Sequence, residues 1–263
     1  GSDDISVGNI IGSNIANIAL ILGCAALIRP IEGHEQAVRR EFPFMAGAAV
    51  LMTLFAYTGG ELARWEGIIL VICMGVYLYW CFLSATAKSS VDDEEEPDEV
   101  EVDELDEVEP DPDAHPVLDG VKILGGILGL AAGAWLMVTS ATSIAREFGV
   151  PELVIGITVV AFGTSLPELA TSLVAAVRDE SDISVGNVIG SNIFNIFLVL
   201  GLVAIIAPMA VGQAALDYDL WFMLAVALGI WPILRTGHRV SRLEGVLMLV
   251  FYASYVAFLF IRP

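Results

Sequence analysis

A single carboxylate stands in the middle of an apolar stretch. The motif GTSLPE ends at Glu168, near the midpoint of the apolar residues 152–177. Pro167 removes a backbone donor and so predicts a broken helix, while Thr164 and Ser165 add hydroxyl groups. Broken backbone at membrane depth is tolerated only where it is buried in protein or lines a cavity. An ionised carboxylate there costs about 2.5–3.5 kcal/mol on insertion scales. We therefore expect a bound cation or a proton to compensate Glu168.

Two further pairs of polar side chains could complete such a site. Ser191 and Asn195 are four residues apart, so both face one side of a helix. Ser13 and Asn17 repeat this spacing. Hard cations such as calcium take six to eight oxygen ligands, and these segments offer oxygen but no soft ligand. The predicted cation ligands are Glu168, Thr164, Ser165, Ser191, Asn195, Ser13 and Asn17.

These residues also have structural explanations. Small and polar residues in membrane helices often serve packing, and the glycine spacings 8–12 and 186–190 suit close helix contact. Glu168 could instead be a protonated structural acid. Packing alone does not require a carboxylate beside broken backbone, and this favours the cation site. Four more asparagines are interpreted as packing groups or as supports for the ligands: Asn9, Asn14, Asn187 and Asn192.

The segment that carries the Ser/Asn pair occurs twice. Residues 4–23 and 182–201 are identical at 16 of 20 positions and align without a gap. The repeat register, in which residue 4 corresponds to residue 182, also relates Glu66 to Glu244 and Tyr77 to Tyr255, so a whole unit is duplicated. The two copies lie on the first and sixth apolar stretches and would cross a membrane in opposite directions. The sequence therefore predicts inverted repeats around a midplane site, which is the arrangement that allows alternating access.

The composition indicates a membrane protein. The chain is 56% hydrophobic with a mean hydropathy of +0.75, yet its net charge is −20. Residues 88–119 hold 16 of the acidic groups, so most of the charge lies outside the apolar stretches. We predict an all-α membrane protein with an inverted-repeat antiporter fold. Its eight expected transmembrane helices span 5–28, 43–62, 65–86, 118–145, 152–177, 183–207, 218–235 and 243–261.

The charged residues predict a linker and an orientation. Residues 88–117 are rich in Glu, Asp and Pro, as a disordered linker is, and they lack the ligand spacing of a calcium-sensing loop. Nine basic residues on one side against three on the other place this linker in the cytoplasm and the C-terminus outside the cell. The excess of acidic residues is interpreted as the sign of a salt-adapted, halophilic organism.

Catalytic chemistry and metal cofactors are not predicted. No nucleophile–histidine arrangement and no phosphate-binding loop is present in the sequence, so we expect neither an enzyme nor a nucleic-acid partner. Cys24, Cys73 and Cys81 lie in apolar stretches without a CxxC motif and are expected to be small buried hydrophobes.

The repeat also predicts a division of the chain. The second copy has an upstream stretch from Leu118 that the first copy lacks, so the first copy is expected to be without its first two helices. The domains would be an incomplete first repeat of three helices (1–87), the linker (88–117) and a complete second repeat of five helices (118–263). The missing helices would then be a partner of the chain, together with the lipid bilayer.

These motifs resemble a known family. GTSLPELATSL followed by DISVGNVIGSNIFNI resembles the second alpha-repeat of the calcium/cation antiporter superfamily, in particular prokaryotic sodium/calcium exchangers. The resemblance implies ten helices in two inverted repeats, of which the chain would hold the third to the tenth. It implies cation binding by the seven ligands named above, and a second glutamate in the missing part. Such exchangers tend to have Asp where this chain has Asn195.

The expected function is secondary antiport that exchanges calcium for sodium by alternating access. Proton-coupled calcium or cation exchange is an alternative, because Asn195 alters the charge of the site. A non-transporting remnant that serves as a membrane structural or interaction module is a second alternative. A channel fits inverted repeats with broken helices less well.

Overall fold

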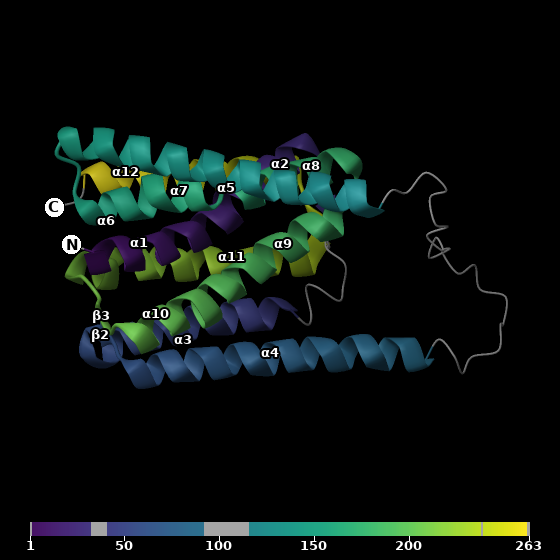
Figure 1. The fold of residues 1–263 in the computed structure, drawn as a ribbon, viewed down its shortest axis with the longest axis horizontal. Coiled ribbons are helices and arrows are strands. Elements are labelled where there is room, and N and C mark those ends of the chain that lie inside the picture. The colour runs from purple at the N-terminus through teal and green to yellow at the C-terminus, as the bar shows by residue number, and fades with distance from the viewer. Residues whose placement is uncertain (1, 33–40, 92–115, 238, 262–263) are drawn as a thin grey trace.

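A computed structural model of the chain describes residues 2–32, 41–91, 116–237 and 239–261. Its long helices run side by side in one bundle, with α4 and α5 at opposite edges of the view (Figure 1). Seven helices in the described residues are long and apolar enough to cross a membrane, and a bent pair would make an eighth span. The predicted fold class, an all-α membrane protein, is confirmed.

Four of the eight spans are built from more than one helical element. The α-helices are α1 (Ser2–Ile15), α2 (Gly23–Ile28), α3 (Phe42–Gly59), α4 (Arg64–Val91), α5 (Pro116–Glu147), α6 (Glu152–Ile155), α7 (Ala161–Thr164), α8 (Leu166–Arg178), α9 (Ser181–Phe194), α10 (Gly201–Ile206), α11 (Leu220–Gly237) and α12 (Arg242–Ile261). The π-helical segments are η1 (Ala16–Leu22), η3 (Gly156–Val160), η4 (Asn195–Leu200) and η5 (Ala215–Asp219). The short strands are β1 (Ile31–Glu32), β2 (Glu61–Leu62), β3 (Met209–Ala210) and β4 (Arg239–Val240).

Each short sheet takes one strand from each repeat. β1 pairs antiparallel with β4, and β2 pairs antiparallel with β3, with Ile31 opposite Val240 and Leu62 opposite Met209. The repeat register converts β1 into β3 and β2 into β4, so the two sheets are images of each other. β2 and β3 lie together at one end of the bundle (Figure 1, left). The two repeats are therefore joined by paired strands at both ends of the bundle.

The strand pairing also determines how the bent pair crosses the membrane. The pair consists of residues 156–164 and 166–178, which meet at an angle of 53°. β2 follows the second span. β3 follows the sixth span, provided that the bent pair crosses the membrane completely and counts as one span. Paired strands must lie on the same side of the membrane, so the number of crossings between β2 and β3 is even. The pairing thus indicates that the bent pair is one span, which gives the eight spans predicted.

Close backbone contacts repeat with the same symmetry. A Cβ on Gly67 of α4 would lie 2.6 Å from the carbonyl oxygen of Gly201 in α10. A Cβ on Gly245 of α12 would lie 2.9 Å from the carbonyl oxygen of Gly23 in α2. The repeat register converts one pair into the other. Small residues let membrane helices approach this closely, and here they join a helix of one repeat to a helix of the other.

The start of α4 is held by a buried carboxylate. Glu66 is 1% exposed and accepts hydrogen bonds from the Thr58 hydroxyl and, at 2.8 Å, from the backbone N–H of Ala63. Its counterpart Glu244 accepts from the backbone N–H and the hydroxyl of Ser241, both at 2.7 Å, at the start of α12. These carboxylates cap orphan N–H groups at helix starts and complement the helix dipole.

We expect Glu66→Ala to lower the free energy of unfolding by about 1–3 kcal/mol, because it leaves the Ala63 N–H without its acceptor and the Thr58 hydroxyl with only the Phe55 carbonyl. Glu61→Ala is the matched control, since Glu61 is an exposed acid of the same turn, and it should change stability by about 0.5 kcal/mol or less. Denaturant unfolding in mixed micelles measures both. Equal stability of the two variants would contradict a capping role for Glu66.

The outer surface of the bundle is apolar, as a bilayer requires. No residue in the apolar window of α5 is buried. Its Leu124 and Trp135 are 58% and 66% exposed. The three cysteines are free, as predicted, but they are only partly buried. They lie between the core and the lipid-facing surface, so the expectation of full burial was wrong.

Some predictions fall on residues outside the described part of the chain. These include residues 92–115 of the predicted linker, and α4 and α5 extend to the two edges of that segment. The predicted domain boundaries and the cytoplasmic position of the linker remain predictions.

Candidate cation site

The fifth span breaks at the GTSLPE motif, as the sequence predicts. α7 ends at Thr164 and α8 begins at Leu166, with Ser165 between them at φ −91° and ψ 4°. Pro167 is the second residue of α8, where its missing N–H costs no hydrogen bond because the first N–H groups of a helix have no partner within it. The proline therefore lies at the start of a new helix, beyond the predicted break. The break places Glu168 in the first turn of α8.

One group of hydroxyls joins α1 to α7. The hydroxyls of Ser13 and Thr164 are 3.2 Å apart, and Thr164 donates to Oδ1 of Asn9 at 3.1 Å. Both hydroxyls also contact the backbone carbonyl of Ala161, at 3.5 Å for Ser13 and 3.1 Å for Thr164. The structure thus brings together two of the predicted ligands, Ser13 and Thr164. It adds Asn9, which the sequence analysis interpreted as a packing or supporting group. Four oxygens from two spans gather here.

A second polar contact joins the two repeats. Asn17 in η1 donates through Nδ2 to Oδ1 of Asn192 in α9 at 3.0 Å, and both side chains are 1% exposed. Asn192 in turn donates to the sulfur of Met45 at 3.5 Å. The supporting role predicted for Asn192 agrees with this geometry, because the contact orients the amide of Asn17.

Glu168 is held by its backbone, and one oxygen of its carboxylate lacks a hydrogen-bond partner. The side chain of Asn187 in α9 donates to the backbone carbonyl of Glu168 at 3.1 Å and to the hydroxyl of Ser172 at 3.0 Å. The carboxylate oxygen Oε2 is buried and accepts no hydrogen bond. α8 packs against η1, the segment that carries Asn17.

The remaining predicted ligands are less closely connected. Ser165 is 4% exposed at the break between α7 and α8. Ser191 and Asn195 are partly buried, on α9 and at the first position of η4. Within the described part of the chain, neither side chain hydrogen-bonds to another predicted ligand. In the described residues, the side chains of Ser191 and Asn195 are thus not hydrogen-bonded to each other.

The π-helical segments were missed by the sequence analysis, which treated these spans as regular α-helices. η1 and η4 are related by the repeat, and Asn17 and Asn195 lie at their starts. π-helical turns are uncommon and frequently occur at functional sites. Hydrophobic periodicity cannot distinguish one π turn inside a long apolar helix, so the sequence offered no clear signal for them.

Three buried carboxylate or amide oxygens of the described residues have no hydrogen-bond donor: Oε2 of Glu168, Oδ1 of Asn17 and Oδ1 of Asn14. All three atoms are hydrogen-bond acceptors, so each of them lacks either a hydrogen-bond donor or a nearby positive charge. Buried acceptors are normally satisfied, and a desolvated cation at the break would satisfy Oε2 of Glu168. Among the described residues, no group of three or more His, Cys, Asp or Glu gathers at one place. The oxygens around the break are therefore mostly neutral, with Glu168 as the charged member.

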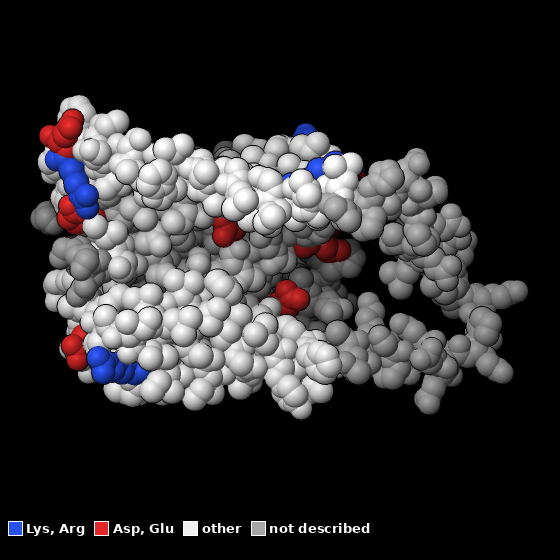
Figure 2. All heavy atoms as spheres, viewed as in Figure 1, with Lys and Arg blue, Asp and Glu red and all other residues white. Residues whose placement is uncertain are grey.

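The bundle is open on one face. Figure 2 shows a hollow between the upper and the lower layers of helices, with isolated acidic side chains along it.

Comparison with known proteins agrees with this geometry. The family described as sodium/calcium exchanger protein matches residues 1–83 and 121–261. The chain belongs to the sodium/calcium exchanger family. It is therefore a multi-pass membrane protein of a transporter family, and the resemblance read from the two motifs is confirmed.

Two relatives and one solved structure illustrate the match. The sodium/calcium exchanger MaX1 of Methanosarcina acetivorans is 32% identical over 289 residues, 97% of this chain and 80% of that protein. The inner membrane protein YrbG of Escherichia coli is 36% identical over 264 residues, 98% of this chain and 77% of that protein. The sodium-calcium exchanger NCX_Mj, in crystals soaked with Na⁺ and Sr²⁺, superposes with a TM-score of 0.71 at 29% identity, over 97% of this chain and 77% of that chain.

Proposed function

We propose that this protein is a secondary antiporter that moves calcium across a membrane in exchange for sodium. The observation that carries the proposal is the buried carboxylate oxygen Oε2 of Glu168, which accepts no hydrogen bond, beside a broken helix in an exchanger-family fold. Relatives named sodium/calcium exchanger support sodium as the coupling ion. The metal ions are cargo, and no catalytic chemistry or cofactor takes part.

The proposed site combines Glu168 with neutral oxygens from three spans. Glu168, Thr164 and Ser165 come from the broken fifth span. Ser13 and Asn17 come from the first span, and Ser191 and Asn195 from the sixth. Because sodium and calcium both prefer oxygen ligands, they compete for one site, and one ion leaves when the other binds. Alternating access then carries either ion across. The distribution of basic residues supports a cytoplasmic linker and an external C-terminus.

Calcium uptake into proteoliposomes tests the proposal directly. The protein, expressed from its complete gene, is reconstituted into vesicles loaded with sodium, and radiolabelled calcium is added outside in sodium-free buffer. We expect uptake that requires the outward sodium gradient. Uptake that is driven by a pH gradient and does not depend on sodium would show that the coupling ion is the proton and not sodium. Absence of uptake under either gradient, from protein shown to be folded, would overturn antiport and favour a structural module.

The charge at Asn195 is expected to set the number of sodium ions. Two glutamates, Glu168 and the one that the family resemblance implies in the other repeat, neutralise one Ca²⁺ or two Na⁺. A third sodium would leave surplus charge in a low-dielectric site. We expect two-for-one, electroneutral exchange in the native protein. Asn195→Asp adds a negative charge and should allow a third sodium, which moves one net charge per cycle and couples transport to voltage by about 2.3 kcal/mol per 100 mV.

Uptake at clamped potentials of 0 and −100 mV measures this coupling. The native rate should be unaffected by potential, and the rate of Asn195→Asp should depend on it. Gln213→Glu is the control, because it adds the same charge at an exposed residue outside the proposed site. Equal dependence on voltage in the native protein and in Asn195→Asp would contradict the charge argument.

A further inference from the structure

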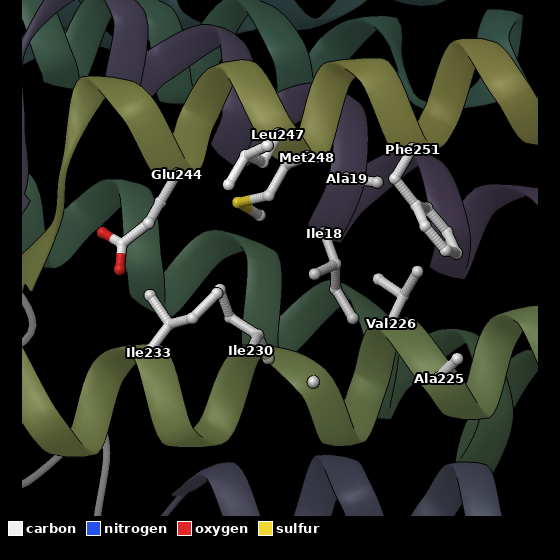
Figure 3. Close-up of a pocket in the computed structure, with 11 residues that line it drawn as sticks. Ile18, Ala19, Ala225, Val226, Ile230, Ile233, Glu244, Leu247, Met248 and Phe251 are labelled. Atoms are coloured by element: carbon white, nitrogen blue, oxygen red, sulfur yellow. The ribbon is translucent and has the colours of Figure 1, made fainter.

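An apolar pocket lies between the last two spans. Its volume is about 210 Å³, and its walls are formed by α11 and α12. Figure 3 shows Ile18 and Ala19, from η1, reaching the space between these two helices. Ile18 is 2% and Ala19 is 1% exposed, so η1 forms the floor of the pocket. Met248 and Phe251 belong to the wall formed by α12, which faces α11 across the pocket.

The pocket exists because two side chains are small. The repeat places Phe197 where this floor has Ala19, and Leu51 where the wall has Gly229. Phe197 is 5% exposed, so the corresponding space in the other half of the protein is filled by a packed aromatic ring. Ala19/Phe197 is also one of the four differences within the repeated motif. The vacancy is therefore specific to the α11–α12 side.

The pocket is continuous with the lipid-facing surface. Leu247, which lines it, is 58% exposed, and Leu243 and Val250 of the same helix are 69% and 56% exposed. Glu244 is the one charged residue of the lining, and its carboxylate already accepts from the Ser241 backbone and hydroxyl. Buried water needs two to four polar partners, which this lining does not offer. An empty pocket would forfeit van der Waals contacts on every wall.

We propose that the α11–α12 pocket binds one acyl chain of a bilayer lipid. The chain enters past Leu247 from the surrounding bilayer and rests on Ile18 and Ala19. It thereby contacts the π-helical segment whose second residue is Asn17. This is a lateral lipid site, distinct from the polar groups at the break between α7 and α8.

Photolabelling in vesicles tests the proposal. The protein is reconstituted in phosphatidylcholine that contains a small fraction of a lipid with a diazirine in its acyl chain, and the labelled peptides are mapped by mass spectrometry. We expect label on Ile18 or Ala19, because a lipid reaches these core residues only through the pocket. Label on Leu243 and Val250 serves as the internal reference for ordinary lipid contact. Absence of label on η1 in the native protein would overturn the site.

Two variants fill the pocket with residues that the chain itself uses at equivalent positions. Ala19→Phe and Gly229→Leu should each lower labelling of Ile18 at least fivefold and leave that of Val250 unchanged. Ile21→Val is the matched control, since it makes the same kind of exchange between the repeats on η1 but does not line the pocket. It should label like the native protein. Undiminished labelling of Ile18 in a folded pocket-filling variant would overturn the proposal, and the native experiment decides the case if neither variant folds.

Discussion

Calcium uptake is expected to fall to background when Glu168 is replaced by Gln. The substitution keeps the size of the side chain and removes its negative charge. Oε2 of Glu168 is buried and accepts no hydrogen bond, so in the proposed site its main partner is the cation. Loss of about 3 kcal/mol of attraction already lowers cation affinity more than a hundredfold. Sodium-driven uptake of radiolabelled calcium measures the effect. Glu180→Gln, an exposed acid between α8 and α9, is the control and should retain uptake.

Binding can be separated from folding in the same variant. Calcium that binds the folded state raises the melting temperature by mass action. We expect this rise in the native protein and in Glu180→Gln, and none in Glu168→Gln. The melting temperature of Glu168→Gln without calcium should equal or exceed the native one, because an unpaired buried charge is removed. Normal uptake by Glu168→Gln would exclude Glu168 from the transport site.

Gly12→Ala is expected to disrupt the packing of α1 on the fifth span. A Cβ on Gly12 would lie 2.7 Å from the Cβ of Ala161 and 2.8 Å from the Cα of Ile157. The first atom it meets is the backbone carbonyl oxygen of Ile157, which cannot rotate away as a side chain could. The helices must separate, and Ser13, the next residue, moves with α1 away from Thr164. Overpacking of this kind costs about 1–3 kcal/mol and occasionally more, and the rigid backbone contact places this case at the upper end.

Gly75→Ala provides a control from within the chain. Gly75 is exposed in α4, no neighbouring atom of the described residues lies within 4 Å of a Cβ built there, and its repeat counterpart is already an alanine, Ala253. The same change should therefore leave stability almost unaltered. Thermal unfolding in detergent, together with the yield of monodisperse protein, measures both variants. Equal loss in the two would show that helix flexibility, and not contact with Ile157, requires the glycine.

Much of the architecture follows from patterns that a sequence displays directly. The spans are long apolar runs, and the duplication is visible because one long motif returns almost unchanged. The break in the fifth span was predictable because Gly163 and Pro167 flank two hydroxyl residues. Glu168 was identifiable for a similar reason, since a carboxylate at that depth needs compensation. These features depend on residue type and position alone.

The details of the site depend on how the helices dock, which the sequence does not display. Asn9 joins Ser13 and Thr164 only because α1 packs against α7. Asn17 meets Asn192, and not its own repeat counterpart Asn195, which a repeat pattern alone does not reveal. The sequence could not distinguish asparagines that face oxygen ligands from asparagines that face other helices, since all of them lie in one repeated motif. The exchange of strands between repeats was equally invisible, because each strand has only two residues.

The pairing of strands between the two repeats has a consequence for biogenesis. β1 leaves the ribosome roughly 200 residues before its partner β4, which at about 5–20 residues per second is a delay of about 10–40 s. The inner strand pair, β2 with β3, closes first, and the outer pair can form only after the seventh span has been inserted. The bundle is thus closed from its middle outward. During that interval the edge of β1 lacks the partner that it has in the finished bundle, so the strand is open to mispairing until β4 arrives.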